Sequence, residues 1–194
     1  MSIVSMLYNA QLIRYAGEDG IAAYGVLMYV SFVFLAMFIG YSTGVAPVVG
    51  FHYGAGSHTE LRSLYRKSLA ITLTASAVML ALAEALARPF SAVFVSYDPG
   101  LFQMTVHAFA VYSFSFLFSG LAIFGSAFFT ALNDGLTSAL ISFLRTLVFQ
   151  VGAVLVLPLI WGIDGVWLSI VAAEVMAALT TGAFLLGKRK KFHY

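Results

Sequence analysis

Ionisable side chains inside long apolar runs are the residues of this sequence that could do chemistry. Arg145 and Glu174 each lie near the middle of such a run, and His107 lies about two helical turns into another. A buried arginine or carboxylate can bind a charged ligand or pair with an opposite charge, and a histidine can change its charge near neutral pH. Arg145 and Glu174 therefore fit either a stabilising contact inside a bundle or a place in a cavity or ion pathway. His107 fits either a satisfied buried histidine or an ion-coupling group.

The depths of Arg145 and Glu174 can be compared by counting from the turn between their runs, residues 162–165. Glu174 lies nearer to that turn than Arg145 does. At 1.5 Å per residue the difference in depth comes to about 9 Å. A direct ion pair between them would then need both long side chains to be extended.

A short apolar segment at residues 1–14 contains a second polar group. Tyr8, Asn9 and Gln11 lie within one turn and offer an aromatic face and amides without a fixed charge. These groups suit either a cavity for organic molecules or hydrogen bonding between helices. As a helix the segment reaches only about 21 Å, less than the hydrocarbon core of about 30 Å. It is predicted to be an interfacial or re-entrant piece, or the second half of a helix whose first half is missing.

The bulk composition indicates that a lipid bilayer is the solvent of this chain. Hydrophobic residues make up 61% of the 194 residues, charged residues make up 9%, and the mean hydropathy is +0.96. Soluble domains carry about 25% charged residues, so this sequence has too few to cover an apolar core with a polar shell. The net charge of +2 is too small for a nucleic-acid-binding surface, and no nucleic acid partner is expected.

The sequence offers no recognisable catalytic or metal centre. It has no cysteine, and its histidines at positions 52, 58, 107 and 193 lack the spacing of zinc ligands. No glycine-rich phosphate loop follows a strand pattern, and no nucleophile elbow occurs. The chain is therefore predicted not to be an enzyme, with no catalytic residue, no metal site and no cofactor.

Turn-forming clusters divide the chain into apolar runs, and these clusters lie at residues 17–20, 98–100, 133–135 and 162–165. The runs between them exceed the 20 or so residues that a helix needs to cross a bilayer, and they lack the alternation of β-barrel strands. Five full spans are predicted at residues 21–50, 68–95, 101–131, 137–160 and 166–187. With the partial helix at 1–14 they predict an all-α polytopic transmembrane helix bundle, a single transmembrane domain over residues 1–194.

Basic residues gather in two segments. Residues 57–67 combine helically spaced leucines with Arg62, Arg66 and Lys67, which predicts an amphipathic linker whose charges contact lipid headgroups. Residues 188–194 form a basic tail. Because positively charged loops face the cytoplasm, both segments, and with them the C-terminus, are predicted to be cytoplasmic. The expected location is the cell inner (plasma) membrane, which the chain crosses several times.

Several motifs occur in order along the chain. They are YNAQL at residues 8–12, GIAAYGV at 20–26, GVAP at 44–47, HYGAG at 52–56, Leu144-Arg145, and GIDGVW at 162–167. Through them the whole sequence resembles the multidrug and toxic compound extrusion (MATE) family, most closely its bacterial MepA-like branch. Members of that family have twelve helices in two six-helix lobes around a central cavity. They exchange organic, often cationic, substrates for Na⁺ or H⁺.

The resemblance implies that this chain corresponds to the C-terminal lobe, with its first helix truncated. It then implies an antiporter lobe for efflux of organic cations, working with a missing N-terminal lobe or partner chain and embedded in membrane lipid. The expected substrate-cavity residues are Tyr8, Asn9, Gln11 and Arg145, and the expected ion-coupling residues are Glu174 and His107. The transported H⁺ or Na⁺ would be the coupling ion, without any bound cofactor.

Two alternatives remain open at the level of the sequence. One is a truncated membrane fragment that inserts into the bilayer and transports nothing. The other is a flippase for lipid-linked precursors from the same superfamily, which would be expected to have more cationic groups in its cavity than Arg145 alone.

Overall fold

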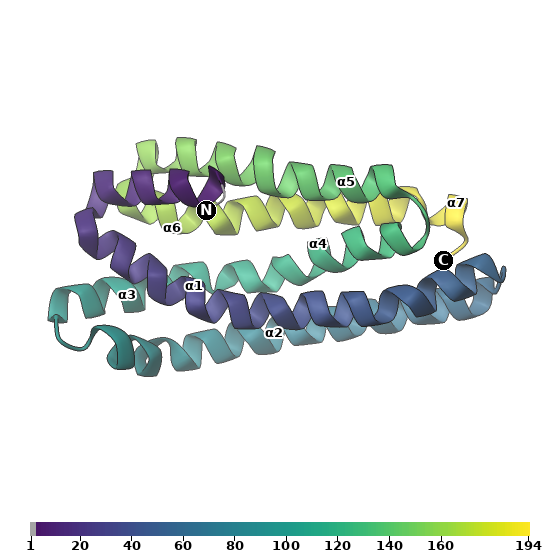
Figure 1. The fold of residues 1–194 in the computed structure, drawn as a ribbon, viewed down its shortest axis with the longest axis horizontal. Coiled ribbons are helices and arrows are strands. Elements are labelled where there is room, and N and C mark those ends of the chain that lie inside the picture. Colours follow the sequence, from purple (N-terminus) through teal and green to yellow (C-terminus); the bar gives the residue numbers. More distant parts are fainter. Residues whose placement is uncertain (1–2) are drawn as a thin grey trace.

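A computed structural model describes residues 3–194, and their backbone is helical almost throughout, with no strand in that range. The elements are α1 (Ile3–Gly54), α2 (His58–Val95), α3 (Pro99–Tyr112), α4 (Phe114–Ala131), α5 (Gly135–Phe143), the π-helical segment η1 (Leu144–Gln150), α6 (Val151–Gly187) and α7 (Arg189–Phe192). Figure 1 shows them packed along one long axis as a single elongated bundle. The predicted all-α helix bundle is therefore confirmed.

Two of the long helices fold back on themselves at a glycine. Gly17 in α1 has φ 63° and Gly162 in α6 has φ 58°, a left-handed conformation that glycine adopts without steric cost. Three residues after each of them, a second glycine lets the two arms approach. A Cβ atom at Gly20 would lie 3.2 Å from the carbonyl oxygen of Leu12, and one at Gly165 would overlap the backbone of the facing arm. Both reversals lie at the left in Figure 1, which we call the hairpin end of the bundle.

Within residues 3–194, four helical stretches are long and apolar enough to cross a membrane, at residues 3–54, 58–95, 114–131 and 135–187. The predicted spans at 137–160 and 166–187 are the two arms of the last stretch, which reverses at Gly162. The predicted span at 101–131 consists of α3 and α4, which meet at Ser113 with helical backbone angles of φ −57° and ψ −29°. The Ser113 hydroxyl donates to the Glu84 carboxylate, and this polar contact ties the junction to α2.

The first arm of α1, up to Gly17, lies inside the bundle. Its residues Val4, Tyr8 and Leu12 follow one another at intervals of four, and all three are buried in the main hydrophobic core. This packing is that of a bundle helix, and it does not fit an arm lying at the membrane interface.

The opposite end of the bundle holds the start of α2 and α7 (Figure 1), and with them seven of the ten Lys and Arg residues, so we call it the basic end. The predicted linker at 57–67 forms the first turns of α2, with Leu61 buried and Arg62, Arg66 and Lys67 exposed. The predicted basic tail is more ordered than a solvated charged segment. Its residues Phe192 and Tyr194 are buried against an aromatic cluster at the ends of α2 and α4, because they are apolar side chains between the charges.

Candidate functional site

Arg145 of η1 and Glu174 of α6 form a direct ion pair in the interior of the bundle. Arg145 Nη2 donates to Glu174 Oε1 at 2.8 Å, and Arg145 Nε lies 3.0 Å from both carboxylate oxygens. The side chains are 19% and 3% exposed. Such a forked contact satisfies both charges with hydrogen bonds, which is the geometry that arginine offers a carboxylate.

The predicted difference in depth of about 9 Å between these residues is too large. The reason is the register of the hairpin that carries them. Gly165 packs against Leu157, and the Ser169 hydroxyl donates to the carbonyl oxygen of Ala153 at 3.1 Å. In that register the two charged residues are offset by three positions, or about 4.5 Å, which an arginine side chain spans.

The ion pair forms part of the wall of a cavity of about 470 Å³ that we call the aromatic cavity. The cavity lies between both arms of α1, α3, α4, η1 and α6, and its lining includes Tyr8, Tyr24, Tyr112, Phe116, Gln150, Arg145 and Glu174. The rings of Tyr8 and Tyr24 stack with their centroids 5.4 Å apart. The hydroxyl of Tyr8 is buried and has no hydrogen-bond partner within residues 3–194.

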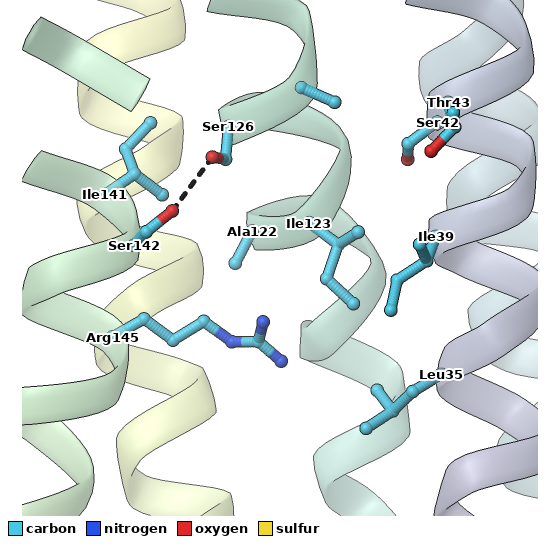
Figure 2. A pocket seen from close by; sticks show the side chains of 11 residues that line it. Leu35, Ile39, Ser42, Thr43, Ala122, Ile123, Ser126, Ile141, Ser142 and Arg145 are labelled. Atoms are coloured by element: carbon cyan, nitrogen blue, oxygen red, sulfur yellow. Dashed lines mark hydrogen bonds between the residues drawn. The ribbon is translucent and has the colours of Figure 1, made fainter. Parts of the chain in front are cut away.

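A second cavity of about 310 Å³ adjoins the first, and we call it the hydroxyl cavity. Arg145 and Leu35 line both cavities. Figure 2 shows the Arg145 side chain reaching from its helix toward α4. The hydroxyls of Ser126 on α4 and Ser142 on α5 lie 3.0 Å apart across this cavity. Arg145 therefore lies at the boundary between the aromatic cavity and the hydroxyl cavity.

The arrangement can bind an organic cation through three features. Tyrosine and phenylalanine rings attract cations over their faces, and they also provide a large apolar contact area. The Glu174 carboxylate is the acidic group in the wall of the aromatic cavity. Because Arg145 neutralises it, a cation that enters the cavity must compete with the guanidinium for the same oxygen atoms.

The structure brings together three of the six residues predicted as site residues. Tyr8, Arg145 and Glu174 line the aromatic cavity. Asn9 and Gln11 point elsewhere on the same arm and line neither of the two cavities, although both are half-buried. Asn9 is turned about 100° away from Tyr8 around the helix. Gln11 lies nearer to the face of Tyr8, but it is one turn closer to Gly17, beyond the last residue of this arm that lines the aromatic cavity.

His107 is not a buried histidine, and that interpretation was wrong. Its side chain is 57% exposed at the hairpin end, and its Nε2 lies 2.8 Å from Oδ1 of Asp164 in the turn of α6. His107 lines neither the aromatic nor the hydroxyl cavity. The pair ties α3 to the α6 hairpin.

Several lining residues were not singled out from the sequence. Tyr24 and Tyr112 lie among many aromatic residues, and nothing in their spacing distinguishes them. The serines do carry a signal. Ser126 lies eight residues before Asp134 and Ser142 lies eight after it, so the turn at 133–135 must bring them face to face.

Within residues 3–194, no group of three His, Asp or Glu side chains gathers in a way that could hold a metal ion.

Comparison with known proteins places the chain in a family. The sequence matches the family model MatE over residues 1–157, and no curated protein matches it.

Solved structures share the fold. An outward-facing multidrug resistance MATE family transporter of the MOP superfamily matches with a TM-score of 0.87 at 22% identity, over 98% of this chain and 42% of that one. The MATE transporter VcmN of Vibrio cholerae matches with a TM-score of 0.85 at 19% identity, over 97% and 43%. A MOP superfamily transporter of Pyrococcus furiosus, described as having a binding pocket of reverse polarity, matches with a TM-score of 0.86 at 22% identity, over 99% and 43%. The chain thus spans less than half the length of these transporters, and it belongs to the MatE family of membrane transporters as a half-size lobe.

Proposed function

We propose that this chain is the C-terminal lobe of a cation-coupled antiporter that exports organic, often cationic, molecules from the cell. The observation that carries the proposal is the buried Glu174 carboxylate, which stands in the wall of an aromatic cavity and is held by Arg145. The inner (plasma) membrane and a cytoplasmic basic end are part of the proposal, because positive charge favours the cytoplasmic side.

In this proposal Glu174 binds three cations in turn, and each excludes the others. Arg145 holds the carboxylate when the cavity is empty. An organic cation displaces the guanidinium and stacks on the tyrosines, and a coupling H⁺ or Na⁺ neutralises the carboxylate and releases the organic cation. Because the cations share one negative charge, binding of one weakens binding of the next, which is the reciprocal coupling that exchange requires.

The lobe would move as a rigid body against its partner. It matches an outward-facing transporter with a TM-score of 0.87 and an inward-facing one with a TM-score of 0.86, so one conformation of the lobe fits both states. Alternating access in transporters built of two repeats is largely a rocking of one half against the other around a central site. The partner would be the N-terminal lobe, closing the cavity from the side that this lobe leaves open.

The polarity of the cavity favours organic cations over lipid-linked anionic precursors. Arg145 is the one Lys or Arg residue in the lining of the two cavities, and Glu174 already neutralises it. A flippase site for a diphosphate headgroup would need cationic groups free to bind the phosphates.

Binding of tetraphenylphosphonium to the purified chain in detergent tests the cavity directly. We expect Glu174→Gln to weaken binding by about tenfold or more, since it removes the charge that attracts the cation. Glu84→Gln removes a carboxylate that lines neither cavity and serves as the matched control. Equal binding by the two variants would contradict the role of Glu174.

Ethidium retention in drug-sensitive cells that express the 194-residue chain tests transport. Lower retention that depends on pH or Na⁺, and that Glu174→Gln abolishes, would show that the lobe transports. Unchanged retention by a chain that binds the cation in detergent would support the alternative of a membrane fragment that does not transport alone.

A further inference from the structure

We propose that the chain binds one anionic phospholipid on the side away from the two cavities, with its phosphate at the basic end. The proposal rests on a pocket and a groove in the surface of the bundle. One is a pocket of about 400 Å³, the basic pocket, lined by Arg62, Arg189, Lys190, His193 and Tyr194. The other is a groove of about 620 Å³, the apolar groove, lined by Leu73, Leu117, Phe118, Leu121, Val175, Ala178, Leu179, Gly182, Ala183 and Leu186.

The basic pocket has the chemistry of a phosphate site. Three of its five lining residues carry permanent positive charge, and none has an acidic side chain. Arginine binds phosphate oxygens through two parallel hydrogen bonds, and lysine contributes a point charge. A phosphodiester placed here would neutralise charges that otherwise repel one another.

The pocket is built into the fold, since its tail wall is fixed at several points. The Tyr194 hydroxyl donates to the carbonyl oxygen of Leu185 at 2.8 Å, and Arg189 Nε donates to the main-chain oxygen of Tyr194 at 3.0 Å. Lys188 binds Asp134 with its Nζ at 2.7 Å from Oδ2, which ties the start of the tail to the turn before α5. The tail therefore holds its basic residues beside Arg62 of α2.

The apolar groove faces away from the two cavities. On α4 the groove residues are Leu117, Phe118 and Leu121, whereas the hydroxyl cavity uses Ala122, Ile123, Ser126 and Ala127. At 100° per residue these two sets point to opposite sides of the helix. In the proposed transporter the cavities face the partner lobe, so the groove faces the lipid.

The apolar groove ends close to the basic pocket, as the acyl chain of a phospholipid ends close to its headgroup. The α6 side of the groove runs from Val175 to Leu186, about 16 Å along the helix, which is about half of the hydrocarbon thickness. Leu186 at its end lies three residues before Arg189 of the basic pocket. One leaflet's acyl chain would fill the groove while its phosphate reaches the pocket.

Native mass spectrometry of the purified chain tests the proposal with three probes. They are phosphatidylglycerol, phosphatidylcholine with the same acyl chains, and inorganic phosphate. We expect phosphatidylglycerol to remain bound, phosphatidylcholine to bind at least about tenfold more weakly, and millimolar phosphate to leave the bound lipid in place. Equal retention of the two lipids, or displacement by phosphate, would overturn the proposal.

Two pairs of matched variants locate the site. The triple variant R62Q/R189Q/K190Q should lose phosphatidylglycerol binding by at least about tenfold, whereas R66Q/K67Q/K191Q removes the same charge outside the pocket and should keep it. Gly182→Leu should fill the groove and weaken binding, because no atom lies within 4 Å of a Cβ built there. Gly152→Leu adds the same side chain outside the groove and should not.

Equal loss in both triple variants would show general attraction to the basic end, and binding unaffected by Gly182→Leu would show a phosphate site without a chain site. Either result would overturn the proposal of a phospholipid site. None of these residues lines the aromatic cavity. Failure here would therefore leave the proposed transport role untouched, and failure of cation binding to Glu174 would leave this site untouched.

Discussion

At the scale of single residues, the Arg145–Glu174 ion pair is the most buried of the ion pairs within residues 3–194. The Glu174 side chain is 3% exposed, so its charge is compensated inside the protein. A buried ion pair adds little net stability compared with apolar residues, but loss of one partner leaves an uncompensated charge. Loss of one partner is therefore costly, whereas replacement of Arg145 by another cation keeps the charge of Glu174 compensated.

Removal of one partner of this pair should destabilise the chain more than removal of both. Glu174→Gln leaves Arg145 without its carboxylate and should lower the free energy of unfolding by about 3–5 kcal/mol. The double variant R145M/E174L should recover most of that loss. Thermal unfolding in detergent measures both, with Lys191→Gln on the exposed tail as the control. A double variant as unstable as the single one would argue that packing, and not charge, sets the stability here.

The Asp134 carboxylate at the basic end predicts a dependence on pH. Burial raises the pKa of Asp134, but hydrogen bonds from Lys188 and Thr137 outweigh it and hold that pKa below its ordinary value. A depressed pKa stabilises the folded state at pH values above about 3.9, and this stability is lost as pH falls through the folded pKa.

Thermal unfolding of the wild type and of Asp134→Asn at pH 7 and near pH 3 measures this contribution. We expect the wild type to be more stable at pH 7 and its advantage to shrink toward pH 3, since the carboxylate becomes neutral, like asparagine, as pH falls through its lowered pKa. The comparison cancels the titration of the other carboxyl groups. A difference that stays constant between the two pH values would contradict the assignment to Asp134.

At the scale of elements, glycine pairs three residues apart shape both hairpins. In each, the first glycine supplies the positive φ and the second provides the space for close approach of the arms. The register that Gly165 allows is also what brings Arg145 within reach of Glu174. The η1 segment that carries Arg145 is π-helical, a geometry often found at functional sites.

Alanine at these glycines should destabilise the α6 hairpin for two distinct reasons. Gly162→Ala must place a side chain at positive φ, which costs about 1–2 kcal/mol. Gly165→Ala drives a methyl group into the backbone of Leu157 and should cost about 1–3 kcal/mol. Gly152→Ala, in open space within the same helix, should instead stabilise by about 0.5–1 kcal/mol. Thermal unfolding ranks the stabilities of the three variants. A Gly165→Ala variant as stable as the wild type would rule out the close approach of Gly165 to the backbone of Leu157.

At the scale of the whole molecule, charge differs between the two ends of the bundle. The basic end carries Arg62, Arg66, Lys67 and the residues of α7, whereas the hairpin end carries acidic turns such as the one at 17–20. This asymmetry predicts a cytoplasmic basic end.

Cysteine labelling in intact cells measures that orientation, and the absence of any native cysteine gives it no background. We expect a membrane-impermeant maleimide to label Glu18→Cys at the hairpin end but not Lys191→Cys at the basic end. Both positions are exposed, and the predicted orientation puts them on opposite sides of the membrane. Lysis should make Lys191→Cys reactive and serves as the control. The opposite labelling pattern would invert the proposed direction of transport.

The sequence by itself determined the membrane location, the helical class, the turns and the family. These properties depend on short stretches of sequence. About 20 consecutive apolar residues are enough to specify a membrane span, and a glycine beside an aspartate is enough to specify a turn. Tertiary structure decided which of these residues meet. The hairpin register joined Arg145 to Glu174 despite their unequal distances from the turn. The aromatic cavity ended before Gln11 on the first arm of α1, and the packing of α3 beside the α6 turn left His107 exposed next to Asp164. Those outcomes depend on offsets of a few residues between packed helices, and such offsets are fixed only when the facing surfaces are in contact.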